Sequence, residues 1–214
     1  MIRLDPKTTA VVAIDMHRGH LDPSVATLPL PAESCRRVIG AARELFAKLR
    51  DRGVPIVHVV TSYRDPAESL SNPFWKAIAE DPAMKRSAAS RHNMAGGPGT
   101  QVIPELLDPR DLVVDRKKRY DCFHGTDLDF VLQRKLSART LVLTGVNTNS
   151  CVLCTAFEAN ARDYAVVVAA DCVDTMDGPE MHGFALRNMA ITVAWVLRND
   201  EILASVELTG RGKE

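Results

Sequence analysis

Three residue types in this chain could together hydrolyse a small amide: a thiol, a carboxylate and a lysine ammonium group. The thiol belongs to Cys151, the carboxylate to Asp15, and the ammonium group to Lys117 or Lys118. A thiol can attack a carbonyl carbon, a carboxylate can take the thiol proton and later protonate the leaving amine, and a cation can stabilise the developing charge. The residue types therefore suggest covalent hydrolysis by a cysteine.

The elements around Cys151 favour this interpretation. Residues 140–145 form a β-branched and Leu-rich run that ends in Gly145, and a short polar turn precedes a helical pattern with Cys151 in its first turn. The helix dipole and a nearby cation would lower the pKa of the thiol, whereas an ionised Asp15 would oppose them. Backbone N–H groups of the turn could bind a tetrahedral oxyanion.

Strand and helix patterns alternate along the whole sequence. This alternation predicts a single domain over residues 1–214, a three-layer α/β/α sandwich on a mostly parallel six-stranded sheet. In such sheets ligands bind beyond the carboxyl ends of the strands, where Asp15 and the cations at 116–119 are expected. The predicted strands cover residues 8–15, 55–61, 111–115, 140–145, 164–170 and 192–197, and the main helices cover residues 31–52, 126 onward, 151–160 and 179–190.

Composition narrows the classes of partner. The 214 residues carry 27 basic and 27 acidic side chains, so no broad attraction to nucleic acid or to an acidic membrane is expected, and a small molecule is the expected partner. No apolar stretch approaches the length of a membrane span. The odd cysteine count, at 35, 122, 151, 154 and 172, favours free thiols in a reducing compartment, which we expect to be the cytoplasm.

A second cluster of potential ligands follows the first predicted strand. Asp15-x-His17-x-x-His20 could hold a metal, but neighbouring ligand types in one loop are more often pocket wall, and that interpretation is favoured. The chemistry above requires no metal and no cofactor, so neither is expected. The irregular segment 62–99 is typical of a lid or pocket wall, to which Trp75 could contribute.

Three segments of the chain form a set of spaced motifs. They are Val12-Ala13-Ile14-Asp15-Met16, Lys117-x-Arg119-Tyr120-x-x-Phe123-x-Gly125-Thr126-x-Leu128 and Thr144-Gly145-Val146-x-Thr148-Asn149-x-Cys151. In order and separation they resemble the three signatures of the isochorismatase-like cysteine hydrolases, and the resemblance spans about residues 8 to 200.

The resemblance implies a catalytic triad of Asp15, Lys117 and Cys151. Lys117 is preferred over Lys118 because the motif lysine stands two residues before the Arg-Tyr pair. The family also implies a cis peptide between Val146 and Asn147, an oxyanion hole formed by the N–H groups of Asn147 and Cys151, and assembly as a homodimer or homotetramer.

Departures from the family pattern narrow the expected activity. The nicotinamidase branch carries a metal-binding Asp-x-His after the second strand, which residues 61–65 lack, and Cys151 itself favours an amide or ureide over the vinyl ether of a true isochorismatase. The Arg119-Tyr120 pair is similar to branches that act on N-carbamoyl or ureido compounds. Isochorismatase and nicotinamidase activities remain the alternatives. The expected substrate-binding residues are of two kinds. Those that could recognise a carboxylate or carbonyl are His17, Arg18, His20, Tyr120 and His124, and Trp75 could line the pocket.

Two other classes of protein compete with a hydrolase. Cys151-Val152-Leu153-Cys154 has the C-x-x-C spacing of thiol–disulfide oxidoreductases, although the apolar residues around Cys154 suggest that its side chain packs in the core. The chain could also be a binding or scaffold protein that retains the fold without turnover, against which the complete set of Asp15, Lys117 and Cys151 argues.

Overall fold

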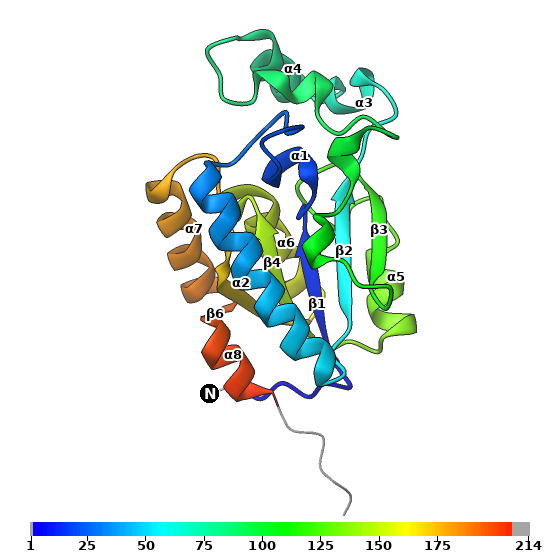
Figure 1. Cartoon of the computed structure of the whole chain (residues 1–214), viewed down its shortest axis with the longest axis vertical. Helices are drawn as coiled ribbons and strands as arrows, with labels where there is room; N and C mark the ends of the chain where they lie inside the picture. Colours follow the sequence, from blue (N-terminus) through cyan, green and yellow to red (C-terminus); the bar gives the residue numbers. More distant parts are fainter. Residues whose placement is uncertain (1, 207–214) are drawn as a thin grey trace, which may run out of the picture.

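A six-stranded sheet forms the centre of the computed structural model, which describes residues 2–206 (Figure 1). Its strands lie in the order β3-β2-β1-β4-β5-β6 and every neighbouring pair is parallel. The strands are β1 (Thr9–Ile14), β2 (Ile56–Thr61), β3 (Leu112–Lys117), β4 (Thr140–Val146), β5 (Ala165–Asp174) and β6 (Trp195–Leu197). The predicted α/β/α sandwich is confirmed, and the last residues of the predicted domain, 207–214, lie outside the described part.

Helices cover both faces of the sheet because its central strands are apolar on both sides. In β1, Val11 and Ala13 pack in one core and Val12 and Ile14 in the other, with none of the four exposed to solvent. The first core includes α2 (Ala32–Asp51) and α8 (Asn199–Ser205); the second includes α5 (Leu128–Phe130), α6 (Leu153–Asn160) and α7 (Pro179–Thr192). No helix within residues 2–206 is long and apolar enough to cross a membrane.

The segment between β2 and β3 is more helical than the sequence predicts. It contains α3 (Pro66–Leu70), α4 (Pro73–Glu80) and three short 3₁₀ helices, at 87–91, 98–100 and 104–106. Asp65 and Asn72 cap α3 and α4 by accepting hydrogen bonds from backbone N–H groups, and a proline occupies the first position of each helix. The helices α3 and α4, together with α1 (Arg18–Leu21), lie beyond the ends of the strands, at the top of Figure 1.

The predicted end of the third strand is wrong by two residues, and the difference decides which cation points inward. Pairing of β2 with β3 runs from Val59 opposite Val114 to Thr61 opposite Lys117, so β3 carries one extra residue, as in a β-bulge. The bulge restores Lys117 to the buried side of the strand and leaves Arg116 exposed. The predicted fifth and sixth strands also shift: β5 continues through Asp174 across another irregularity, and α7 occupies residues up to Thr192.

Gly145 allows the two central strands to approach closely at their carboxyl ends. Its φ is +108°, and a Cβ atom built there would lie 1.9 Å from the carbonyl oxygen of Ile14. Any larger residue would therefore separate β4 from β1, or force its own backbone into a conformation that L residues rarely adopt. The turn that carries Cys151 begins directly after this contact.

We expect Gly145→Ala to lower the free energy of unfolding by at least about 2 kcal/mol, because it combines a positive φ with a clash against backbone. Gly40→Ala is the matched control. Gly40 lies within α2, and a Cβ atom added to it would meet no atom within 4 Å, so alanine should raise the free energy of unfolding by about 0.5–1 kcal/mol. Urea unfolding of both variants measures the two changes in the free energy of unfolding, which should have opposite signs. Equal changes would contradict the explanation.

Candidate functional site

Asp15 lies directly after β1 and is completely buried. Its φ of +52° places it in the left-handed region, which is uncommon for a residue other than glycine. The backbone N–H of Thr61 donates to Oδ1 over 3.0 Å, and the Thr61 hydroxyl donates to the same oxygen over 2.7 Å. The end of β2 therefore fixes the carboxylate of the neighbouring strand.

Lys117 reaches the same place from the edge strand β3. Its Nζ atom lies 2.5 Å from Oδ2 of Asp15, 2.9 Å from the hydroxyl oxygen of Thr61 and 3.3 Å from Sγ of Cys151. The side chain is 2% exposed, so these contacts replace water as the surroundings of a buried ammonium group. The structure thus brings the carboxylate, the ammonium group and the thiol together around one nitrogen atom.

Mutual attraction keeps Asp15 and Lys117 charged despite their burial. Desolvation would raise the pKa of Asp15, but the Lys117 ammonium and His17 outweigh it and hold the pKa of the carboxyl well below its usual range. Desolvation would lower the pKa of Lys117, but the Asp15 carboxylate raises it well above the ordinary value. The pair is therefore an ion pair at neutral pH.

Cys151 rests as a thiol, which differs from the expected helix-dipole activation. Burial raises the pKa of Cys151 to about 12, and Asp15 adds to the rise while Lys117 opposes it. The residue belongs to a π-helical turn, Thr148–Val152, from which α6 continues. The residue is only 5% exposed, so desolvation raises the pKa by more than the helix N-terminus can lower it. Attack by this thiol requires a base, and Asp15 is the ionised carboxylate beside it.

The turn between β4 and Cys151 is held from its far side by residues that follow β5. The peptide bond between Val146 and Asn147 is cis. The side-chain oxygen of Asn147 accepts a hydrogen bond from the backbone N–H of Met176 over 2.9 Å. Among the described residues, the backbone N–H of Asn147 has no hydrogen-bond acceptor, and Asn147 lines the pocket described next.

A pocket opens over these groups at the carboxyl ends of the strands. Asp15, Thr61, Lys117 and Cys151 lie in its lining, together with the residues of the segment between β2 and β3 that cover them. The further lining residues include Leu28, Tyr63, Phe74, Trp75, Ile78, Arg86, Arg119, Tyr120 and Ser150.

Trp75 and Tyr120 form an aromatic wall of the pocket. Their ring centroids are 5.1 Å apart, and the guanidinium carbon of Arg119 lies 5.1 Å from the Trp75 centroid. Arg119 also donates hydrogen bonds to carbonyl groups of Glu68 and Lys118, which fixes it against α3. The wall therefore combines flat apolar surface with a guanidinium group.

The predicted substrate-binding residues divide into three groups. His20, Tyr120 and Trp75 line the pocket. His17 is fully buried beside Asp15, with its Nε2 atom 3.4 Å from Oδ1. Arg18 and His124 lie outside the pocket lining: Arg18 donates to Asp22 and Gln101, and His124 is exposed. Both residues are close to the motifs in the sequence, which suggested that they face the pocket, but the backbone directs their side chains elsewhere.

Cys154 does not face this site. It is half-buried, outside the pocket lining, and all five cysteines of the chain are free. Its thiol is therefore less deeply packed than predicted, but no pairing with Cys151 is present.

Several residues of the site were not predicted from the sequence. Thr61 could have been found, since it ends a predicted strand next to β1. His92, Asn93 and Arg86 lie in the irregular segment, where no periodicity indicates direction. His92 lines the pocket with His20. Burial lowers the pKa of His20 to about 3 and lowers that of His92 well below its ordinary value, so both rings are neutral.

Arg86 links this segment to the turn of Cys151. It makes two hydrogen bonds to the carboxylate of Asp177, of 2.6 and 2.7 Å, and the same carboxylate accepts a bond of 2.8 Å from the side chain of Asn149. The covering segment and the cysteine turn thus share one partly buried hydrogen-bond network.

Comparisons with known proteins identify relatives of the whole chain. The model of the isochorismatase domain matches residues 9–201. The ureidoacrylate amidohydrolase RutB of Pseudomonas syringae pv. syringae is 31% identical over 224 residues, covering 98% of this chain and 88% of that protein.

Solved structures are similar over nearly the whole chain. An isochorismatase family protein from Burkholderia thailandensis has a TM-score of 0.76 and 31% identity, covering 96% of this chain and 98% of that one. The N-carbamoylsarcosine amidase of Thermoplasma acidophilum has a TM-score of 0.68 and 27% identity, covering 95% and 99%. On the match of its domain, its fold and the arrangement at its strand ends, the chain belongs to the isochorismatase family of hydrolases.

Proposed function

We propose that this protein is a cysteine-dependent amidohydrolase that cleaves the C–N bond of a small N-carbamoyl or ureido compound. The observation that carries the proposal is the position of Lys117 Nζ, in contact with both the Asp15 carboxylate and the Cys151 thiol at the base of a pocket. A hydrolase acting on carbon–nitrogen bonds other than peptide bonds is also what the amidohydrolase relatives support.

The proposed reaction begins with proton transfer from Cys151 to Asp15 as the sulfur attacks the substrate carbonyl carbon. An S–C bond forms, and the C–N bond breaks as Asp15 passes the proton to the leaving nitrogen. The resulting acyl or carbamoyl thioester is attacked by a water whose proton Asp15 takes, and the thiol is restored. Lys117 keeps Asp15 ionised beforehand and stabilises negative charge during both attacks.

The oxyanion would be held by the backbone N–H groups of Asn147 and Cys151. The absence of an acceptor for the Asn147 N–H within residues 2–206 supports this assignment, because an unpaired donor next to the nucleophile is available to the substrate oxygen. The contact between the Asn147 side chain and Met176 fixes the direction of that peptide plane.

The pocket wall supports a planar, polar substrate. Trp75 and Tyr120 offer flat surfaces, and Arg119 offers a cation suited to a carboxylate. A ureido or carbamoyl group attached to a small carboxylic acid would match both features. The relatives named for ureidoacrylate and N-carbamoylsarcosine act, by their names, on compounds of this class.

The alternative activities have less support. Both activities would share the fold. Nicotinamidase activity is disfavoured because the Asp-x-His motif is missing from residues 61–65, and isochorismatase activity because a buried cysteine stands at the nucleophile position. A redox role is disfavoured because Cys154 lies outside the pocket. The expected homodimer or homotetramer and the expected cytoplasmic location stay predictions.

Ammonia release from a panel of ureides, carbamoyl amino acids, maleamate and nicotinamide tests the activity. Cys151→Ala should lower turnover of the best substrate at least about 10³-fold, because it removes the nucleophile. Intact-mass spectrometry of the wild type with a slow substrate should show an adduct on Cys151. Cys154→Ser is the control and should retain hydrolysis. Turnover that survives in Cys151→Ala would contradict the mechanism. Failure of the wild type to release ammonia from any compound of the panel would favour a binding protein.

The two neighbouring lysines provide a matched pair of variants. Lys117→Met should lower kcat/KM about 10²–10⁴-fold, because the buried carboxylate and the developing charge lose their cation. Lys118→Met should change it only a few-fold, since Lys118 pairs with Glu68 outside the pocket. Steady-state kinetics on variants with native circular dichroism checks this, and similar losses in both would contradict the assignment.

Alkylation by iodoacetamide tests the thiol independently of turnover. With a pKa of about 12, Cys151 should react slowly at pH 7, and its rate should rise roughly tenfold per pH unit up to pH 10. Peptide mapping assigns the modified cysteine. Fast alkylation of Cys151 at pH 7, with a rate that does not rise with pH, would contradict a protonated resting thiol.

A further inference from the structure

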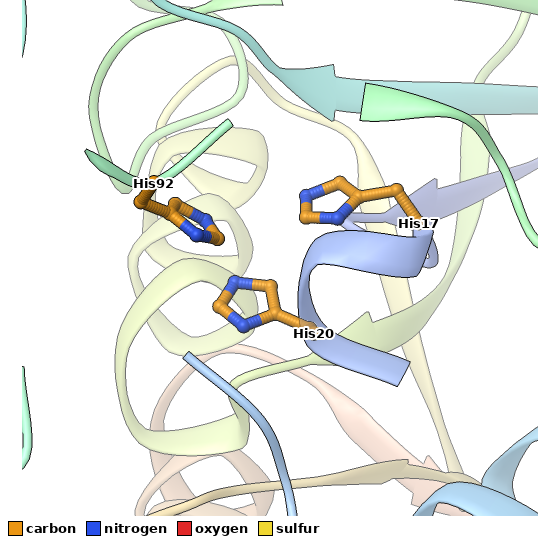
Figure 2. Close-up of side chains that lie close together, drawn as sticks. All are labelled: His17, His20 and His92. Carbon is orange, nitrogen blue, oxygen red and sulfur yellow. The ribbon is translucent and has the colours of Figure 1, made fainter. Parts of the chain in front are cut away.

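A cluster of three buried imidazoles lies beside the proposed nucleophile, and the hydrolytic mechanism does not use it. One ring nitrogen from each of His17, His20 and His92 lies within 4.8 Å of the other two. Figure 2 shows the three rings gathered around a common space, His17 and His20 from the α1 segment and His92 from the segment that covers the pocket. Their centroids are separated by 5.0, 5.8 and 4.6 Å.

We propose that His17, His20 and His92 bind a divalent transition-metal ion of the zinc class, with its open coordination positions facing the pocket of Cys151. Imidazole nitrogen suits such ions, and three histidines with a vacant fourth position is one of the ligand sets of catalytic zinc sites. Two of the ligands come from the segment after β1. The Asp-x-His motif with which the nicotinamidase branch binds metal after β2 is absent from this chain. The proposal replaces the metal-free expectation, because no sequence pattern indicates that His92 lies beside the other two.

Hydrogen bonds at Nδ1 leave the Nε2 atoms of His20 and His92 to face the ion. Nδ1 of His20 lies 2.6 Å from the carbonyl oxygen of Leu28, so Nδ1 carries the proton and Nε2 keeps its lone pair. Nδ1 of His92 lies 2.8 Å from the Thr27 hydroxyl, which accepts from Nδ1–H in the tautomer that leaves Nε2 able to bind an ion. Donation of the second ring N–H to a protein oxygen is the usual outer contact of metal-bound histidine. Within residues 2–206 neither Nε2 atom has a hydrogen-bond partner.

His17 is held by two polar neighbours. Its Nε2 atom lies 3.4 Å from the Asp15 carboxylate and 2.8 Å from the side-chain nitrogen of Asn93. A carboxylate beside a ligand histidine also favours a nearby cation. The ion would therefore sit next to the Asp15–Lys117 pair without replacing either partner.

Close packing of two segments builds the cluster. Gly19 separates the two histidines of the α1 segment, and a Cβ atom there would lie 1.9 Å from Oδ1 of Asn93. Glycine thus lets the His92–Asn93 segment approach α1. A tetrahedral ion with bonds of about 2.0–2.1 Å needs nitrogens about 3.4 Å apart, which requires small ring movements from the present separations.

The position of the ion suggests what it would bind. His20 and His92 line the same pocket as Cys151, so a vacant position would accept water or an oxygen of the substrate. This substrate role rests on the proposed hydrolase function. Binding of the ion does not, and it can be measured without turnover.

The test uses full-length protein stripped with a chelator, incubated with zinc chloride, passed through gel filtration and measured by elemental mass spectrometry. We expect about one zinc ion per wild-type chain and below about a tenth of an ion in the double variant His20→Gln, His92→Gln. His124→Gln, the same change at an exposed histidine, should retain zinc. Cys151→Ala should also retain it, which separates ion binding from failure of the hydrolytic proposal.

A second measurement covers the case in which the double variant fails to fold. In wild-type protein with ¹⁵N-labelled histidine, zinc should shift the ring signals of three of the six histidines, those of the cluster, and leave His58, His124 and His182 unchanged. The proposal is overturned if the wild type binds no zinc, if the folded double variant retains it, or if the shifted signals belong to other histidines.

Discussion

The rest of the site depends on one buried contact, the ion pair between the Lys117 ammonium group and the Asp15 carboxylate. Each charge alone would be costly in an interior without water, and removing one partner of such a pair typically costs about 3–5 kcal/mol. Together they remain charged, with the lysine also touching Cys151. The pair supplies an ionised base beside a thiol that is itself protonated. In the proposed hydrolysis, reactivity therefore resides in the arrangement of the three groups and not in a permanently activated cysteine.

Three backbone features make that contact possible. The left-handed conformation of Asp15 turns its carboxylate toward the end of β2, where Thr61 binds it. The irregularity in β3 brings Lys117 across from the edge of the sheet. Gly145 brings β4 against Ile14, so that the cysteine turn starts close to Asp15. Each is a departure from regular strand geometry, and all three occur at the same end of the sheet.

The segment between β2 and β3 connects the chemistry to the pocket above it. It contributes the aromatic wall and His92, and Arg86 joins it through Asp177 to Asn149 in the cysteine turn. A substrate that contacts Arg86 would thus touch a residue that is linked through Asp177 to the turn of Cys151. Asp15 contacts both the imidazole cluster, through His17 beside Oδ1, and Lys117, which lies beside Oδ2.

The sequence by itself determined the layers of the fold and the three chemical groups. Apolar runs that alternate with amphipathic helices specify a parallel sheet, and the positions of Asp15 and Cys151 at strand ends follow from those runs. The choice between Lys117 and Lys118 did not follow from the residues alone, because a single extra residue in β3 reverses which side chain points inward. The protonation of Cys151 was also decided by tertiary burial, which outweighs the helix dipole. His92 and Arg86 reach the site only through long-range packing of an irregular segment, and a sequence pattern records local periodicity, not which distant side chains meet.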